Sequence, residues 1–340
     1  MFNRSVLTAT LLLVACSTQG ELAAKPGKPP FKEFYQSFRQ QVAAEGLNPA
    51  LLDEAFDGKV QPYAPAIKSE ANQPEIKSTF ESYVAKMLAK PRREKGAALL
   101  AEHKKELAKA SQATGVPPEV IVALWGIESN FGANMGNHPV VPALVTLAWD
   151  NDRGEFFGKE AVNALRVARK RGINPAELTG SWAGAMGQCQ FMPSNYLKHA
   201  ADGNGDGKVD IWNTPADVFM SAGTFLKALG WQKDVPWRLP AQVSVKLPES
   251  AGFNERGLSE PHPLAQWQRW GVVPKGTSFS KLGGTETALR MYRPLGDKGP
   301  TYMLGPNFDV LLRWNYSSYF AASALLLAES IANEGNLPDV

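Results

Sequence analysis

The spacing of apolar residues predicts a chain built mainly from amphipathic helices. Apolar positions recur every three or four residues over 33–56, with a break at residues 46–49, and again over 74–90 and 93–114, on either side of Pro91. The same spacing predicts later helices at residues 120–128, 155–171, 214–229 and 317–333. The helix at 120–128 is apolar on most sides, so we expect it to be buried.

The pattern changes after Pro236. Residues 240–312 contain short runs in which apolar and polar residues alternate, QVSVKL, TALRMY and FDVLLRW, and such runs are typical of strands. Strands and helices do not alternate regularly, which argues against a parallel sheet, and no period of 20–50 residues repeats. We therefore expect a mainly α (α+β) fold. Its parts would be a helical lobe at about 33–115, a core at about 116–236 and 313–335, and a β-rich lobe at about 237–312.

Composition narrows the class of protein. The chain has 340 residues, of which 44% are apolar and 20% are charged, so it can bury a substantial core and is not disordered as its main state. The formal net charge of +3 excludes a strongly basic nucleic-acid-binding protein. Two cysteines are too few for a disulfide scaffold or a cysteine-rich zinc site, and the four histidines form no HExxH pair.

Residues 1–15 predict a signal peptide. Arg4 provides a short positive region, and an apolar stretch follows that is too short to span a bilayer. The stretch ends in LVAC, which resembles the bacterial lipobox, so Cys16 would become the acylated first residue of the mature protein. Ser17, in place of aspartate, implies the periplasmic face of the outer membrane, and residues 16–32 would form a flexible tether. A buried N-terminal helix is the alternative, and the polar tract after Cys16 argues against it.

Glu128 is a candidate general acid. It stands at the C-terminal end of the apolar helix, within GIESNFG, just before polar and glycine residues that end the helix. Apolar neighbours and the negative end of the helix dipole would both favour the protonated form of its carboxyl group, and a general acid must hold a proton near neutral pH. The alternative is a solvent-facing acid at a frayed helix end.

A second segment, residues 181–196, has the composition of a sugar-binding surface. It reads SWAGAMGQCQFMPSNY, in which small residues permit a close approach of the backbone to a ligand. Gln190 offers a donor and an acceptor, and Met192 and Tyr196 offer apolar faces. A sugar also presents polar edges and apolar faces. Taken alone, the segment fits a tight turn between packed helices equally well.

Together these two segments resemble the lytic murein transglycosylase B family (glycoside hydrolase family 103). The motifs GIESNFG and GAMGQ-x-QFMPS-x-Y carry the resemblance, which extends from about residue 35 to about residue 335. It implies a lysozyme-like catalytic core and a periplasmic enzyme, often a lipoprotein, that cuts peptidoglycan. It assigns Glu128 as the single catalytic acid, places Ser181 and Gln190 against the glycan and lines the cleft with Met192.

The resemblance also implies substrate-binding residues outside the two motifs. These are Tyr83, upstream of the glutamate, and Phe225, Trp314, Asn315 and Phe320. Phe225, Trp314 and Phe320 stand where some relatives have tyrosines. An aromatic ring can still stack on a sugar at those positions, whereas the hydrogen bond of a tyrosine hydroxyl is lost.

With one acid, the resemblance implies a reaction that consumes no water. Glu128 would protonate the bridging oxygen of the MurNAc–GlcNAc β-1,4 bond, with assistance from the substrate's acetamido oxygen. It would then take the proton of the muramic 6-hydroxyl, which closes a 1,6-anhydro ring, and such a lyase would serve cell-wall turnover and remodelling. Most glycosidases instead use two carboxylates, so a hydrolytic muramidase is one alternative. A peptidoglycan-binding lipoprotein without catalysis is the other.

The segment DGNGDGKVD, residues 202–210, has the spacing of a calcium-binding EF-hand loop. The ligands would come from the side chains of Asp202, Asn204, Asp206 and Asp217 and from the backbone carbonyl of Lys208. The twelfth position, usually a bidentate glutamate, is Asn213, so Asp217 would complete the site, as the lengthened loop of the family implies. We expect a structural Ca²⁺ and no organic cofactor. The alternative is a metal-free turn.

Cys189 is a lone thiol inside the second motif, with no evident histidine base in the sequence. The sequence favours a small packed residue beside the cleft, with a cysteine nucleophile as the alternative. The expected partners are peptidoglycan glycan strands, the membrane through the N-terminal lipid only, and other cell-wall enzymes. We expect a monomer and no nucleic-acid partner.

Overall fold

The computed structural model describes residue 25 and residues 27–71 and 78–337. The predicted signal peptide, Cys16 and most of the predicted tether lie outside the described residues, as does part of the helix predicted at 74–90. The described chain is mainly α-helical with a small antiparallel sheet, so the predicted fold class is confirmed. In this part of the chain, no helix combines the length and the apolar character that crossing a bilayer requires.

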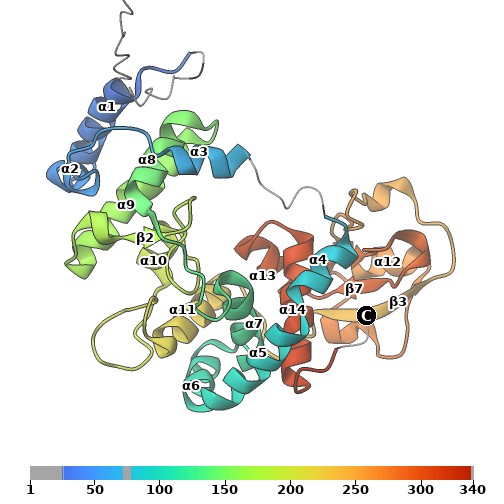
Figure 1. Ribbon diagram of the computed structural model, residues 1–340. Helices are drawn as coiled ribbons and strands as arrows, with labels where there is room; N and C mark the ends of the chain where they lie inside the picture. The colour runs from blue at the N-terminus through green and yellow to red at the C-terminus, as the bar shows by residue number, and fades with distance from the viewer. Residues whose placement is uncertain (1–24, 26, 72–77, 338–340) are drawn as a thin grey trace, which may run out of the picture.

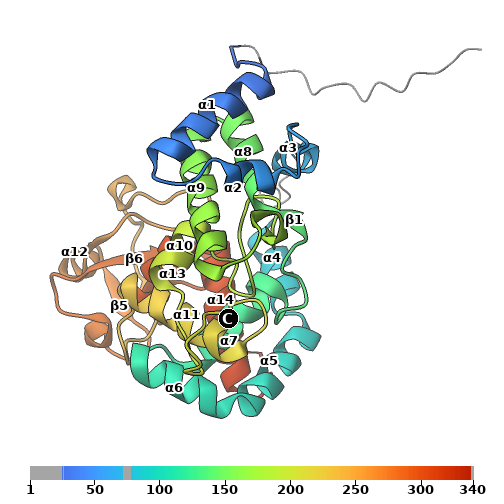
Figure 2. The ribbon, with the colours of Figure 1, turned by 90° about the vertical axis from the view of Figure 1, so that its left-hand side faces the viewer.

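One end of the molecule is a group of helices around α8 (Figures 1 and 2). Its members are α1 (Phe31–Ala44), α2 (Ala50–Ala55), α3 (Ala64–Ala71), α8 (Val140–Asp150) and α9 (Gly154–Arg171). Every residue of α8 is buried, because α1, α2 and α3 contact this helix and α9 packs along it. α1 is amphipathic and buries Tyr35, Phe38 and Val42 on one face.

The chain that precedes α1 lies against this group. Nζ of Lys25 is 2.8 Å from a carboxylate oxygen of Asp150, and the indole nitrogen of Trp149 donates a hydrogen bond to the carbonyl of Pro29. At its described end, the segment predicted as a flexible tether is therefore in contact with the folded chain.

The centre of the molecule is α7 (Pro118–Ser129), the helix that carries Glu128. It is buried along most of its length. The helices that contact it are α5 (Lys90–Glu102), α6 (Lys104–Thr114), α11 (Pro215–Ala228) and α14 (Ser318–Ala332), and α4 (Phe80–Met87) packs on α14. Gly96 permits α5 to lie close to α14, since a Cβ there would be 2.6 Å from the side chain of Ile331. Helices from both halves of the sequence thus fix the position of α7.

The β-rich lobe lies to one side of these helices (Figure 1). Its antiparallel sheet has the strand order β4-β6-β7-β3-β5. The strands are β3 (Arg238–Val243), β4 (His262–Pro263), β5 (Val272–Pro274), β6 (Ala288–Tyr292) and β7 (Tyr302–Leu304). Met303 of β7 pairs with Leu239 of β3 and with Met291 of β6. These three side chains join Trp267 of α12 (Leu264–Arg269) in a small core that belongs to the lobe.

Two of the predicted strands need correction. The run TALRMY forms β6 as predicted, whereas QVSVKL overlaps only the end of β3, which begins earlier. The run FDVLLRW is a helix, α13 (Pro306–Trp314), and not a strand. Pro306 begins this helix and Asp309 lies in its first turn, and both residues favour a helix start. Phe308 and Leu311 are buried three residues apart, which is a helical spacing.

The helices around α7 also differ from the prediction. The predicted break between two helices falls at residues 88 and 89, between α4 and α5, and Pro91 lies in the first turn of α5, where the missing N–H costs no hydrogen bond. The helix predicted at 93–114 is instead interrupted at His103, between α5 and α6. The spacing of apolar residues failed to predict α3, α8 and α10 (Pro193–His199). α8 is buried on all sides, so it has no polar face that would reveal its period.

Candidate active site

Glu128 lies in the last turn of α7, directly before a constrained turn of the backbone. Asn130, Phe131 and Gly132 have positive φ angles of 51°, 60° and 81°, and this conformation is costly for a bulky residue such as Phe131. Ser129 helps to hold the turn, because its Oγ accepts a hydrogen bond from the Gly132 amide. The half-buried side chain of Glu128 is therefore presented from a helix end of fixed geometry.

The second motif folds into a compact turn beside this helix end. β1 (His138–Pro139) pairs with β2 (Thr179–Gly180), which brings the chain that follows Glu128 alongside the start of the motif. Met186 forms backbone bridges to Gly180 and to Phe191, so the chain folds back on itself. Gly136 permits the close approach, because a Cβ at that position would collide with the carbonyl oxygen of Gly180.

Two hydrogen bonds join residues on either side of the first motif to the second motif. The indole nitrogen of Trp125 in α7 donates to Oε1 of Gln188 at 2.7 Å, and Nε2 of Gln190 donates to the carbonyl of Met135 at 3.1 Å. Gln188 is buried and donates in turn to the carbonyl of Trp212. Gln190 has a positive φ of 50°, so strained backbone again accompanies a candidate site residue. The two motifs form one connected unit.

The third part of the site comes from the C-terminal end of α13. The indole nitrogen of Trp314 donates a hydrogen bond of 2.7 Å to Oε1 of Glu128. The Trp314 ring also packs on Phe191 and Phe225, with ring centroids 5.7 and 5.0 Å away. The structure thus brings Glu128, the second motif and the C-terminal segment together.

The remaining predicted glycan contacts divide by burial. The half-buried ones are Ser181, Gln190, Met192 and Asn315. Phe225 and Phe320 are only 7% and 4% exposed. Both rings pack in the core in this structure, and their contact with a sugar stays a prediction.

Tyr83 lies on α4 and is almost fully buried. Its ring is 5.9 Å from the ring of Tyr319 in α14, and Phe80 packs on Tyr319 at 5.5 Å. The guanidinium of Arg256 covers Tyr319 at 4.8 Å from the ring centroid. Tyr83 therefore belongs to an aromatic wall that α4 and α14 form together.

Cys189 is buried near Glu128. The side chain is 3% exposed, and its Sγ donates to the carbonyl of Val218. Burial, with a smaller contribution from the charge of Glu128, raises the pKa of the thiol far above its usual range. Because the thiolate is the nucleophilic form, this environment favours the packing role over a nucleophile.

The fully buried acidic residues of the described chain are engaged elsewhere. They are Asp150, Glu160 and Asp217. Asp150 forms an ion pair with Lys25, and the other two carboxylates accept hydrogen bonds from backbone amides. Each of these three carboxylates therefore holds the fold in place.

The predicted calcium loop lies between α10 and α11, where its carboxylates hold the loop together. Asp202 accepts hydrogen bonds from two backbone amides of the loop, and Asp217 accepts two more, each at 2.7 Å. Asp206 accepts from the Lys208 amide and from the side chain of Asn204. The amides that bind Asp202 hold the pKa of its carboxyl group below the usual range, so this group is charged at neutral pH.

The donors of this loop suit a hard cation, because all of them are oxygens. The carboxylates, however, are directed at backbone amides. Over the described ranges, no three His, Cys, Asp or Glu side chains are grouped as a metal site. The chemistry of the donor set therefore fits calcium, although the carboxylates do not converge on one point.

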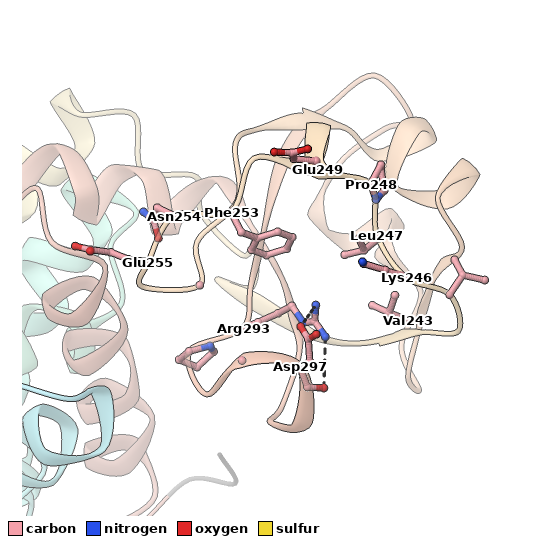
Figure 3. Close-up of a pocket in the computed structure, with 14 residues that line it drawn as sticks. Val243, Lys246, Leu247, Pro248, Glu249, Phe253, Asn254, Glu255, Arg293 and Asp297 are labelled. Carbon is pink, nitrogen blue, oxygen red and sulfur yellow. Dashed lines mark hydrogen bonds and ion pairs between the residues drawn. The ribbon is translucent and has the colours of Figure 1, made fainter.

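A hollow of 630 Å³ in the β-rich lobe is lined by none of the motif residues (Figure 3). Arg293 lies inside it, and Asp297 neutralises its charge at a distance of 2.7 Å. Phe253 is the aromatic residue of the lining, and the remaining charges are of both signs. We assign this hollow no part in the chemistry of Glu128.

The sequence did not reveal two polar contacts of the site. Trp314 is expected from the sequence to stack on a sugar, yet it is a hydrogen-bond donor to Glu128. Nothing marks this contact in advance, because the two residues are 186 positions apart. The sequence does contain a hint of the Gln188 contacts. A side-chain amide that stands among small apolar residues is expected to be buried, and a buried amide needs hydrogen-bond partners.

Residues 30–329 match the sequence profile of the family described as the transglycosylase SLT domain. The chain is 34% identical over 233 residues to the membrane-bound lytic murein transglycosylase B of Escherichia coli (strain K12). That alignment covers 68% of this chain and 61% of the relative, so the chain spans about three fifths of the relative's length.

Two solved structures are similar over nearly the whole chain. SltB3 of Pseudomonas aeruginosa, in complex with NAG-anhNAM-pentapeptide, gives a TM-score of 0.79 at 32% identity and covers 91% of this chain and 81% of that one. The lytic transglycosylase Slt35 of Escherichia coli, in complex with calcium, gives a TM-score of 0.76 at 28% identity and covers 90% and 94%. The lysozyme-like fold that the sequence motifs implied is confirmed. Because the profile matches most of its length, the chain belongs to the transglycosylase SLT domain family.

Proposed function

We propose that this protein is a peptidoglycan lytic transglycosylase. The observation that carries the proposal is the position of Glu128, where the two motifs meet the C-terminal segment and Trp314 donates to its carboxylate. The family and the relatives named lytic transglycosylases support the same activity. The ligand of SltB3, NAG-anhNAM-pentapeptide, supports peptidoglycan as the substrate class.

In the proposed reaction, Glu128 protonates the oxygen that bridges MurNAc and GlcNAc, and the bond from that oxygen to C1 of MurNAc breaks. The acetamido oxygen of the same MurNAc stabilises the positive charge that develops at C1. The Glu128 carboxylate then takes the proton of the muramic 6-hydroxyl, whose oxygen bonds to C1 and closes the 1,6-anhydro ring. No water is consumed, and Glu128 is protonated again for the next cycle.

Trp314 assists the first step through its hydrogen bond. That step produces the Glu128 carboxylate, and a donor N–H stabilises this charged form. The rings of Phe191 and Phe225 lie behind the Trp314 indole and make this side of the site apolar. An apolar surround strengthens the hydrogen bond and limits attack by water.

The proposed glycan contacts are Ser181, Gln190, Met192 and Asn315. Nε2 of Gln190 is used in hydrogen bonds to the carbonyls of Met135 and Gly187, so Oε1 is the atom proposed to accept from a sugar hydroxyl. Met192 precedes α10 and would provide an apolar face. Tyr83 is proposed to contribute through the aromatic wall of α4 and α14.

The test is the substitution Glu128→Gln, which keeps the shape of the side chain and removes the acid. Release of soluble fragments from purified murein should fall by at least about a thousandfold, while binding to murein is retained. Glu119→Gln, the same change in the first turn of the same helix, is the matched control and should retain activity. Full activity of Glu128→Gln would contradict the proposed role.

Two alternatives are distinguished by simple measurements. A hydrolytic muramidase needs a second carboxylate, and the two motifs contain no acidic residue besides Glu128. Its products would contain one water more than those of the proposed reaction. A non-catalytic binding protein would retain murein without releasing fragments from it.

We also propose that the loop 202–217 binds Ca²⁺ in a structural role. The ligands would be Asp202, Asn204, Asp206 and Asp217 through their side chains and Lys208 through its carbonyl. The donor set consists of oxygens, as Ca²⁺ prefers, and the related Slt35 structure is a calcium complex. The ion would tie the loop to the start of α11 and take no part in proton transfer.

The proposed place of work is the periplasmic face of the outer membrane, with a lipid on Cys16 as the anchor. The LVAC sequence and Ser17 support this, and the Escherichia coli relative is membrane-bound. A role in cell-wall turnover, as a monomer that works beside other cell-wall enzymes, follows from the same proposal. Replacement of Cys16 with serine should move the protein from the membrane fraction to the periplasmic fraction.

A further inference from the structure

Beside the proposed site, a groove of 380 Å³ lies between the β-rich lobe and the segment that joins α13 to α14. We call it the junction groove. Its lining comes from residues 254–256 and 258–260, from Arg290 and Leu312, and from residues 316–318. Tyr316 of this lining follows Trp314, which donates to Glu128, by two residues. Two residues of extended chain span about 7 Å, so the groove begins close to the proposed site.

Arg256 is positioned in the junction groove without a carboxylate partner. Its guanidinium lies over the ring of Tyr319, and Nη1 is 3.5 Å from Oγ of Ser317. None of the ion pairs of residues 27–71 and 78–337 involves it. Arg290, which lines the same groove, is by contrast neutralised by Asp309 at 2.8 Å. The fold thus orients a guanidinium that makes no ion pair within the described residues, although Glu255 and Glu260 also line the groove.

Tyr316 adds an aromatic face at the edge of the groove. Its side chain is 96% exposed, although it stands two residues after the half-buried Trp314. A tyrosine ring of this kind offers a large apolar surface at a low entropic cost and suits a ligand that has both polar and apolar parts. The groove therefore combines a cation with an aromatic platform.

We propose that the junction groove binds the peptide branch of peptidoglycan, with Arg256 pairing with a peptide carboxylate and Tyr316 packing against the peptide. This inference rests on the proposed function, because the branch is attached to the glycan that Glu128 cleaves. A peptide carries a carboxylate at its end, and the planar guanidinium binds a carboxylate through two parallel N–H donors. Glu255 and Glu260, which also line the groove, disfavour a carboxylate elsewhere in it.

The first experiment compares two substrates. One is murein glycan that retains its peptides, and the other is the same glycan after an amidase has removed them. The readout is the ratio of kcat/KM on the first to kcat/KM on the second. Arg256→Gln should lower this ratio about tenfold, the effect of losing a charge-assisted hydrogen bond, and Tyr316→Ala about threefold. Arg256→Lys should recover part of the loss, because it keeps the charge without the planar fork.

Arg269→Gln is the matched control, since it makes the same change on an exposed residue of α12 in the same lobe. Its ratio should equal that of the wild type. A purely structural role of Arg256 would lower kcat/KM on both substrates equally and leave the ratio unchanged, which would overturn the proposal.

A binding measurement separates this inference from the proposed function. In the Glu128→Gln background, titration calorimetry compares the affinity for a peptide-bearing glycan fragment with that for the bare fragment. Adding Arg256→Gln should lower the ratio of the two affinities about tenfold, to the disadvantage of the peptide-bearing fragment. This result is expected whether or not the wild type cleaves either substrate. Equal affinities for the two fragments before the second change would show that the groove does not bind the peptide.

Discussion

Nε1 of Trp314 lies 2.7 Å from Oε1 of Glu128 and donates a hydrogen bond to it. An indole N–H is only a donor, so Oε1 must act as an acceptor in this contact. In the proposed reaction, Oε2 carries the acidic proton to the glycosidic oxygen while Oε1 keeps its contact with the indole.

Trp314→Phe should lower kcat on murein by about tenfold to a hundredfold. The change retains an aromatic ring against Phe225 but removes the donor, and a hydrogen bond to a charged group contributes about 1.5–3 kcal/mol. Steady-state release of muropeptides measures the effect. Trp270→Phe, in the β-rich lobe, is the control. An unchanged kcat for Trp314→Phe would show that the hydrogen bond has no part in catalysis.

Gln188→Leu should destabilise the fold by about 2 kcal/mol or more. The change leaves the buried indole N–H of Trp125 and the carbonyl of Trp212 without their partner. Denaturant unfolding measures the loss. Gln268→Leu, on an exposed position of α12, should cost less than about 0.5 kcal/mol. A neutral Gln188→Leu would mean that the two motifs do not depend on this connection.

Cys189 should not react with thiol reagents at pH 8 in the folded protein. Burial raises the pKa of its thiol, so the reactive thiolate is scarce, and the sulfur is also inaccessible. The experiment uses protein with Cys16 replaced by serine, so that Cys189 is the thiol observed, and denaturation should expose it. Cys189→Ser should retain most of the activity. Rapid labelling of Cys189 in the native state would contradict the packing role and support a cysteine nucleophile. Loss of activity in Cys189→Ser without a loss of stability would do the same.

Calcium should raise the melting temperature if the loop 202–217 binds it. An ion at a hundredfold excess over its Kd stabilises the fold by about 2.7 kcal/mol, and a chelator should reverse the effect. Asp202→Asn should weaken binding at least about tenfold, whereas Asp234→Asn, in an exposed turn, should not. Calorimetry that detects no binding to the wild type would exclude the site.

The periodic helices were the most predictable part of the fold. α9, α11 and α14 show their polar or small-residue faces in the sequence, so their spacing identified them. α8 was not predicted, because it is buried on every side and so shows no periodic polar face. α13 was mistaken for a strand, because a short apolar run is compatible with the period of a helix and with that of a strand. Pro91 indicated the break between α4 and α5, but the break lies about two residues earlier, because a proline is tolerated in the first turn of a helix.

The motifs indicated which residues come together around Glu128, but not the contacts between them. Glu128, Gln190 and Trp314 were identified from motifs, since each motif is a continuous stretch of sequence. The burial of Phe225 and Phe320 depends on helices that pack from elsewhere in the chain, so the sequence did not indicate how little of either ring is exposed. Arg256 stands outside every motif, and only the fold reveals that it lies beside the segment that follows Trp314.

The mass of the products tests the central claim most directly. Purified murein is digested with the protein, and the released fragments are analysed by mass spectrometry without chemical reduction. Fragments with MurNAc ends that are lighter by one water than those of a muramidase digest are the predicted result, since Glu128 closes a 1,6-anhydro ring. Fragments that carry the added water would contradict the account and identify the protein as a hydrolase.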